Sequence, residues 1–115
     1  MNDRQRFEEL VVEALDSLPA WVLERLENVE VLVEERPPRG EPDLLGRYDG
    51  IPITARDGGY TFVSPDTITL YRKTIEQESG NDEAKLRDVV AHTVVHEVAH
   101  YFGISDDRLR EMDAY

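Results

Sequence analysis

One stretch near the C-terminal end decides the fold: residues 96–106 read HEVAHYFGISD. It lies in a longer segment, from about residue 82 to residue 102, where apolar residues recur every three or four positions as on a helix. His96 and His100 are one turn apart on that helix, about 40° apart around its axis and about 6 Å apart along it. Both imidazoles can therefore lean toward one small ion.

The residues around the two histidines complete a metal site of a definite kind. Glu97 lies about 100° around the helix from His96, which places it beside a water molecule on the ion rather than in the ligand shell. Gly103 ends the helix and lets the chain turn back, so that Asp106 can supply a third ligand. Three protein ligands with an open fourth position are what a catalytic zinc needs.

Other interpretations of the same residues stay open. An HExxH string also arises by chance, and a helix can hold two histidines on a packed or solvated face. Asp107 follows Asp106, and either carboxylate could instead cap a helix that residues 104–105 introduce. His92 precedes His96 by one turn, but three histidines spanning about 12 Å cannot meet one ion on a straight helix. We expect His92 to be an ordinary hydrogen-bonded helix residue.

Tyrosines could also stabilise negative charge at such a site by donating a proton. A tyrosine at these positions is more often half-buried in packing, and we assign no role to any of them. The candidates are Tyr60, Tyr71 and Tyr101.

Length and charge limit what the whole molecule can be. The 115 residues suit one domain, residues 1–115, and the 40% that are hydrophobic can supply its core. Lys and Arg number 13 against 25 Asp and Glu, and the formal net charge of −12 repels nucleic acid backbones. The chain has no cysteine, no signal-like N-terminus and no apolar run that could span a membrane. We therefore expect a cytoplasmic protein with no membrane or nucleic acid partner.

The N-terminal third of the chain predicts two helices and a strand. Apolar spacing indicates an amphipathic helix over residues 7–18, and Pro19 favours a second, shorter helix directly after it. Alternation over residues 29–34 predicts a strand, and the prolines and glycine of residues 37–42 predict a loop.

The middle of the chain has the composition of short β-strands. Between residues 44 and 71 turn signals separate β-type pieces, of which residues 60–63 and 68–71 are the better strands. The polar residues 79–82 can start the long helix that carries the two histidines.

These features together resemble a known family, the small bacterial zincin-like metallopeptidases, also called minimal zincins. The resemblance implies a compact α/β (α+β) domain, in which a short mixed sheet lies over the active-site helix, with N-terminal helices and a short C-terminal helix. Its main motif is HExxHxxGxxD within residues 93–109, and weaker matches lie at residues 43–46, 50–54 and 68–72.

The resemblance also implies the roles of the site residues. His96, His100 and Asp106 would bind Zn²⁺, and Glu97 would be the general base. The resulting hypothesis is a zinc-dependent metallopeptidase that hydrolyses peptide bonds through a metal-bound water activated by Glu97. Its substrate would be a peptide or an unfolded protein.

The sequence departs from larger zincins in two respects. The third ligand is Asp rather than the His of metzincins, and Met112 follows it too closely for a Met-turn, so we place Met112 in a last short helix. The residues after His100 are too few for the subdomain that forms the lower wall of the cleft in larger zincins. A wide cleft, a short peptide substrate or a partner that completes the open cleft would all fit.

Zincins pair an extended substrate with the sheet edge nearest the active-site helix. Here we expect that edge to be the strand at residues 68–72, just upstream of the helix. Thr69 and Tyr71 would lie on one face of the strand, and Leu70 would offer its N–H to the peptide.

Two other functions compete with the peptidase hypothesis. The first is a non-catalytic metal-binding or protein-interaction module that keeps the zincin fold, and Glu97 counts against it because a closed structural site needs no unligated base. The second is a metallohydrolase acting on RNA, against which the charge of −12 counts.

Overall fold

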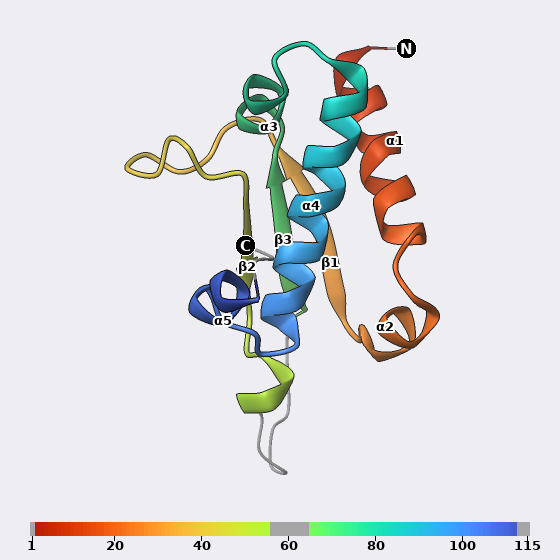
Figure 1. Ribbon diagram of the computed structural model, residues 1–115, viewed down its shortest axis with the longest axis vertical. Coiled ribbons are helices and arrows are strands. Elements are labelled where there is room, and N and C mark those ends of the chain that lie inside the picture. The colour runs from red at the N-terminus through yellow and green to blue at the C-terminus, as the bar shows by residue number, and fades with distance from the viewer. Residues whose placement is uncertain (1, 56–64, 113–115) are drawn as a thin grey trace.

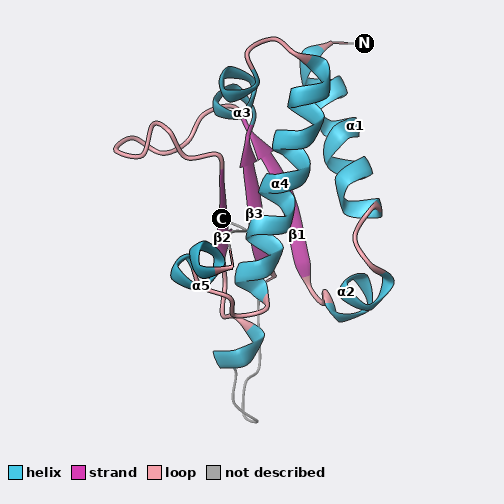
Figure 2. Cartoon of the chain, in the orientation of Figure 1, coloured by secondary structure: helices cyan, strands magenta, loops and turns pink. Residues whose placement is uncertain are grey.

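The structure is a computed structural model and describes residues 2–55 and 65–112. It has the predicted α+β class, with helices and a mixed sheet (Figure 2). The elements of the described residues are, in chain order, α1 (Asp3–Asp16), α2 (Ala20–Arg25), β1 (Val29–Glu34), β2 (Gly46–Asp49), a 3-10 helix (Ile53–Ala55), β3 (Asp66–Tyr71), α3 (Arg72–Ser79), α4 (Glu83–Tyr101) and α5 (Asp106–Glu111).

Strand β3 is the centre of the sheet, whose order is β1-β3-β2. β1 runs parallel to β3, with Val29 opposite Asp66, and β2 runs antiparallel to it, with Gly46 opposite Leu70. The expectation that residues 68–72 form the sheet edge is therefore wrong. Leu70 is 0% exposed between two paired strands, so its N–H cannot reach a peptide.

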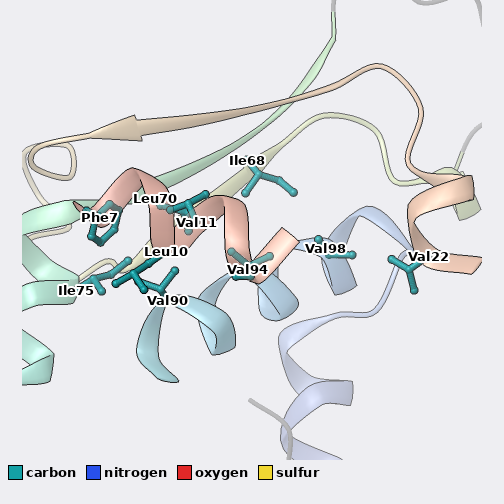
Figure 3. Close-up of a cluster of buried hydrophobic side chains, with 11 residues drawn as sticks. Phe7, Leu10, Val11, Val22, Ile68, Leu70, Ile75, Val90, Val94 and Val98 are labelled. Carbon is teal, nitrogen blue, oxygen red and sulfur yellow. The ribbon is translucent and has the colours of Figure 1, made fainter. Parts of the chain in front are cut away.

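Helices α1 and α4 lie side by side over one face of the sheet (Figure 1). Successive side chains of a strand point to opposite faces of the sheet, so every second residue of β1 faces the helices. The apolar sides of the two helices pack against these residues. Figure 3 shows this core, which comprises Phe7, Leu10, Val11, Ala14, Val22, Ile68, Leu70, Ile75, Val90, Val94 and Val98.

Most predicted elements are found at or near their predicted places. The helix predicted over residues 7–18 is α1, which begins earlier at Asp3 and ends earlier at Asp16. The second helix is α2, and Pro19, which we expected in its first turn, is its N-cap. The strand over residues 29–34 is β1. The predicted strand at residues 60–63 lies outside the described residues.

Helix α3 is an element that the sequence did not predict, as is the 3-10 helix at Ile53–Ala55. Helix α3 occupies the stretch after Tyr71, and Arg72, expected in a strand, is its first residue. Its buried side chains are Arg72, Ile75 and Ser79, of which only Ile75 is apolar. Arg72 is buried in ion pairs with carboxylates, and Ser79 is buried while it donates to the Ile75 carbonyl. The buried side of α3 is therefore mostly polar, and the sequence shows no helical spacing of apolar residues there.

In residues 2–55 and 65–112, no helix has the length and apolar composition needed to cross a membrane. The longest of them, α4, has 19 residues and carries charged side chains along its exposed side. Its position over the sheet brings it next to both β2 and β3.

Candidate active site

Helix α4 presents the two histidines because its rotation is fixed by its buried stripe. The Asp82 side chain accepts a hydrogen bond from the Lys85 N–H at 3.0 Å and so caps the first turn. Val90, Val94 and Val98 then point into the core at four-residue intervals. Each of these valines is followed two positions later by a histidine. The three histidines, His92, His96 and His100, form a row on α4 that is more exposed than the valines.

The end of α4 turns the chain back toward its own histidines. Gly103 adopts a left-handed conformation with φ of 85°, and its N–H donates to the His100 carbonyl at 2.9 Å. The N–H of Ile104 donates to the Ala99 carbonyl at 3.0 Å. This pair of hydrogen bonds is a Schellman motif, and it needs a residue that accepts positive φ at Gly103.

Helix α5 begins directly after this turn and carries the acidic candidates. Ser105 caps it by accepting a hydrogen bond from the Arg108 N–H at 3.1 Å, so neither aspartate serves as the cap. Asp106 Oδ1 lies 3.2 Å from His96 Nε2 and 2.9 Å from His100 Nε2. Asp107 instead pairs with Arg110 at 3.3 Å, and its side chain is 91% exposed.

The ring of His100 is held in the form that a metal requires. Its Nδ1 lies 2.9 Å from the Ile104 carbonyl oxygen, which can only accept, so the proton of the neutral ring sits on Nδ1. In this neutral form the Nε2 lone pair faces Asp106 Oδ1, an acceptor opposite an acceptor. A cation between these atoms would remove the repulsion, so the donor set fits a metal ion.

His96 has the electrostatic environment of a neutral imidazole. Burial, assisted by the neighbouring His100, lowers the pKa of His96 below its ordinary value of 6.5. The ring centres of His96 and His100 lie 4.8 Å apart, and the ring planes are at 85° to each other. Donors around a tetrahedral Zn²⁺ at roughly 2.0–2.1 Å lie about 3.3 Å from one another. The distances of Asp106 to both rings match that spacing.

Glu97 lies close enough to be considered as a ligand too. The ligand atoms of His96, Glu97 and His100 all lie within 4.8 Å of one another. Asp106 is the other candidate for a third donor, and its Oδ1 lies within 3.2 Å of both Nε2 atoms. This geometry favours Asp106 over Glu97 as the third donor.

The carboxylate of Glu97 is buried, with 5% of the residue exposed. Burial raises the pKa of Glu97 to about 7, and the hydrogen bond from the Tyr48 backbone N–H opposes that rise. A base that gains and loses a proton near neutrality is suited to general acid–base catalysis.

Strand β2 supplies the backbone on the other side of this carboxylate. The Tyr71 N–H donates to the Leu45 carbonyl at 2.9 Å, which makes these two a hydrogen-bonded pair of the antiparallel ladder. Because such pairs alternate, Gly46 and Tyr48 direct their N–H and C=O groups to the outer edge of β2, the edge away from β3. The edge next to the site is thus β2.

A groove of about 670 Å³ runs between the segment before β2 and the exposed side of α4, and it reaches His96 and Glu97. Besides Glu97, three acidic side chains and one Lys line this groove: Asp43, Glu78, Asp88 and Lys85. A second hollow of about 350 Å³ is lined by His100 and by residues of the turn after it.

The remaining sequence candidates lie outside the ligand cluster. His92 is exposed in the groove, with its ring centre 6.3 Å from that of His96. Tyr101 is buried and its hydroxyl donates to the Arg25 carbonyl at 3.0 Å, which confirms a packing role. Tyr71 is buried in the sheet. Tyr60 lies outside the described residues.

Comparison with known proteins now decides the family. The family model of the zincin-like metallopeptidases matches residues 26–115. The chain belongs to the zincin-like metallopeptidase family. The resemblance inferred from the HExxHxxGxxD motif is thereby confirmed, and this zincin-like chain shares with its family the metallopeptidase type of fold.

One solved structure similar to this zincin-like chain is a conserved hypothetical protein from Thermo thermophilus. The two chains are 23% identical, with a TM-score of 0.59, and the match covers 87% of this chain and 94% of the other. That likeness supports the fold alone. No curated protein matches the chain.

Sequence reasoning missed the backbone contributions to this site. Gly46 and Tyr48 flank Glu97, and the Ile104 carbonyl sets the tautomer of His100. A signal for Gly46 was present, since a glycine within a β-type segment often marks a close approach of backbone to a neighbour. The Tyr48 and Ile104 contacts come from the main chain, and no side-chain pattern reports them.

Proposed function

We propose that this chain is a cytoplasmic zinc-dependent peptidase that hydrolyses peptide bonds in short peptides or unfolded segments. His96, His100 and Asp106 would hold the Zn²⁺, and Glu97 would be the general base. The observation that carries the proposal is that one carboxylate oxygen, Asp106 Oδ1, lies within 3.2 Å of both histidine Nε2 atoms, beside a buried glutamate.

The ion, when bound, would polarise the scissile carbonyl and acidify a water molecule. Glu97 takes the proton of the attacking water, and the same carboxyl group then delivers a proton to the leaving amide nitrogen. In the chain without an ion, burial already raises the pKa of this carboxyl group to about 7, which favours proton uptake. Its burial also keeps bulk water from competing for that proton.

The substrate would lie extended along the outer edge of β2. Gly46 directs its N–H and C=O groups to this edge, and Tyr48 directs its C=O group there while its N–H holds Glu97. The groove and the second hollow open near the two ends of the edge. Main-chain pairing gives affinity with little sequence selectivity. A short, extended peptide therefore fits better than a folded protein, and a partner that completes the cleft is compatible with this arrangement.

The acidic side chains of the groove disfavour a nucleic acid substrate, because Asp43, Glu78 and Asp88 would face its phosphates. A purely structural or binding role for the metal is disfavoured by Glu97. A closed site has no use for a buried carboxylate that is poised to ionise near neutrality.

The test is metal analysis of the purified chain combined with a peptidase assay on a diverse peptide pool. We expect one zinc per chain, lost in His96→Ala and kept in the matched control His92→Ala. Glu97→Gln preserves the shape of the side chain and cannot accept a proton, so zinc stays and hydrolysis falls about 10²-fold or more. A zinc-loaded wild type that cleaves nothing in the pool would favour the binding-module alternative.

A further inference from the structure

Strand β2 and helix α4 come into close contact at Gly46. A Cβ atom added there would lie 2.8 Å from Thr93 Cγ2, 3.1 Å from the backbone oxygen of Thr69 and 3.4 Å from Glu97 Cγ. Thr93 and Glu97 are one turn apart on α4, and Thr69 belongs to the neighbouring strand β3. A methyl group at Gly46 would therefore be enclosed by helix and sheet together.

The atoms around Gly46 cannot easily yield to such a methyl group. Thr93 is buried, and its Oγ1 donates to the Val89 carbonyl at 2.7 Å, which fixes the rotamer that places Cγ2 toward Gly46. The Thr69 oxygen belongs to the backbone of the central strand. The remaining response is for β2 to move away from α4.

Such a movement would reach the Glu97 carboxylate through Tyr48. Tyr48 lies two residues after Gly46 on the same strand, and its backbone N–H holds that carboxylate. The Tyr48 side chain is anchored separately, because its hydroxyl donates to Asp66 Oδ2 at 2.7 Å and its ring packs edge-on against Tyr101. A shift at Gly46 would therefore tilt β2 and change where the Tyr48 N–H meets Glu97.

We propose that Gly46 is a positioning residue of the site. By having no side chain, it lets β2 rest on the Thr93–Glu97 turn of α4, and this contact fixes the Glu97 carboxylate relative to a peptide on the outer edge of β2. The catalytic part of this inference rests on the proposed function. The packing part rests on the contacts of Gly46, Thr93 and Tyr48 alone.

The experiment compares the wild type with Gly46→Ala, Thr93→Ser and the double variant Gly46→Ala/Thr93→Ser. Thr93→Ser removes the methyl group that the new Cβ would meet and keeps the hydroxyl that bonds Val89. Four quantities are measured on the zinc-loaded chains: melting temperature, zinc content, kcat and KM on a cleaved peptide, and the exchange rate of the Tyr48 amide by NMR.

In Gly46→Ala we expect kcat to fall about tenfold or more with zinc retained, because a small misplacement of a reacting group is costly. The Tyr48 amide should exchange at least about tenfold faster as its hydrogen bond to Glu97 weakens. The double variant should recover most of both losses, since the two residues are in contact and their effects are not additive.

Several results would overturn the inference. One is a Gly46→Ala chain with a lower melting temperature but with the kcat and the Tyr48 amide exchange rate of the wild type. A merely structural role of Gly46 predicts this result. Another is a loss that Thr93→Ser does not relieve. If Gly46→Ala alone does not fold, recovery of a folded, zinc-loaded double variant supports the inference, and failure to recover overturns it.

The outcome also separates this inference from the proposed function. A wild type that binds zinc and cleaves no peptide refutes the peptidase, and the Tyr48 amide still decides whether Gly46 sets the packing. Wild-type cleavage with unchanged kcat in a folded Gly46→Ala chain refutes the positioning role and leaves the peptidase intact.

Discussion

Asp106 and Asp107 are chemically identical neighbours with different surroundings. Asp106 points to the two histidine rings, whereas Asp107 faces solvent beside Arg110. Because both lie in the first turn of α5, both also interact favourably with the helix dipole. The difference between them is therefore contact with the site and not helix stability.

The two aspartates should differ in their effect on zinc affinity. Asp106→Ala removes the charged side chain proposed as the third ligand, so the dissociation constant for zinc should rise by about 100-fold or more. Asp107→Ala removes an exposed ion pair of little energetic value, so affinity should stay within about twofold. Titration against a competing chelator measures both variants. The reverse ranking would move the ligand to Asp107.

At this scale the sequence predicted the side chains and not the backbone of the site. The spacing of His96 and His100 follows from helix geometry, and Asp106 follows from a glycine that turns the chain. The structure brings all three together with Glu97, while their roles as ligands and base remain predictions. Gly46 and Tyr48 could not be placed beside Glu97, because strand order and register are nonlocal.

Among the elements, the turn between α4 and α5 has the strictest conformational requirement. Gly103 has positive φ, and a Cβ there would collide with Thr54 Oγ1. The turn thus needs glycine twice, for its backbone and for its packing. The direction in which α5 carries Asp106 depends on this turn.

Gly103→Ala should therefore lower both stability and zinc affinity. Positive φ alone costs an alanine roughly 1–2 kcal/mol, and the clash with Thr54 adds to it and displaces α5. Gly40→Ala is the matched control, since Gly40 also has positive φ and nothing lies within 4 Å of its would-be Cβ. Thermal unfolding and zinc titration of both variants separate the effects. Equal zinc affinity in the two would contradict our account.

The sheet shows why element order is harder to predict than element position. The local sequence pattern predicted both β1 and β3 as strands. It did not predict their order, because we expected β3 at the edge of the sheet and it lies in the centre. Nothing in the residues of β3 says that both β1 and β2 pair with it. Helix α3 was missed for a related reason, because the burial of Arg72 depends on an ion pair with Glu35, a residue distant in the sequence.

At the scale of the whole molecule, one cluster of charges ties distant elements together. Glu35, just after β1, accepts from Arg72 of α3 at 2.6 and 2.8 Å and from Arg4 of α1 at 3.1 Å. Arg4 also donates to the Val33 carbonyl at 2.7 Å, and Arg72 to Glu76. The cluster joins three elements at the end of the sheet opposite α2.

The cluster makes stability depend on pH in the acid range. Hydrogen bonds from Arg72 lower the pKa of Glu35 from 4.5 to about 2. The unfolded chain binds this proton first, so the contribution of Glu35 is complete above pH 4.5 and is lost as pH falls toward about 2. Unfolding midpoints in urea across roughly pH 2–6 measure it.

Glu35→Gln should flatten the part of the pH profile that Glu35 causes. Glu34→Gln is the control, because Glu34 is the residue next to Glu35, is exposed on β1 and loses the same charge in this substitution. A wild-type profile no steeper than that of Glu35→Gln would mean that the cluster contributes nothing to acid sensitivity.

The N-terminal helices belong to the same core as the site. The family match begins at residue 26, yet Phe7, Leu10 and Val11 of α1 are buried against α4. The helix that carries the histidines is therefore held from one side by α1 and from the other by the sheet (Figure 1). Its rotation, and with it the direction of both rings, is set by this packing.

The proposed ligands come from two helices, and this division has a consequence for how an ion would enter and leave. The histidines are mostly buried on a long helix packed on both sides, whereas the Asp106 side chain is 47% exposed on a short one. The Ile104 carbonyl keeps the His100 ring in place without the ion. Uptake should then need little reordering of the chain, and exchange should proceed stepwise through rotation of a single carboxylate.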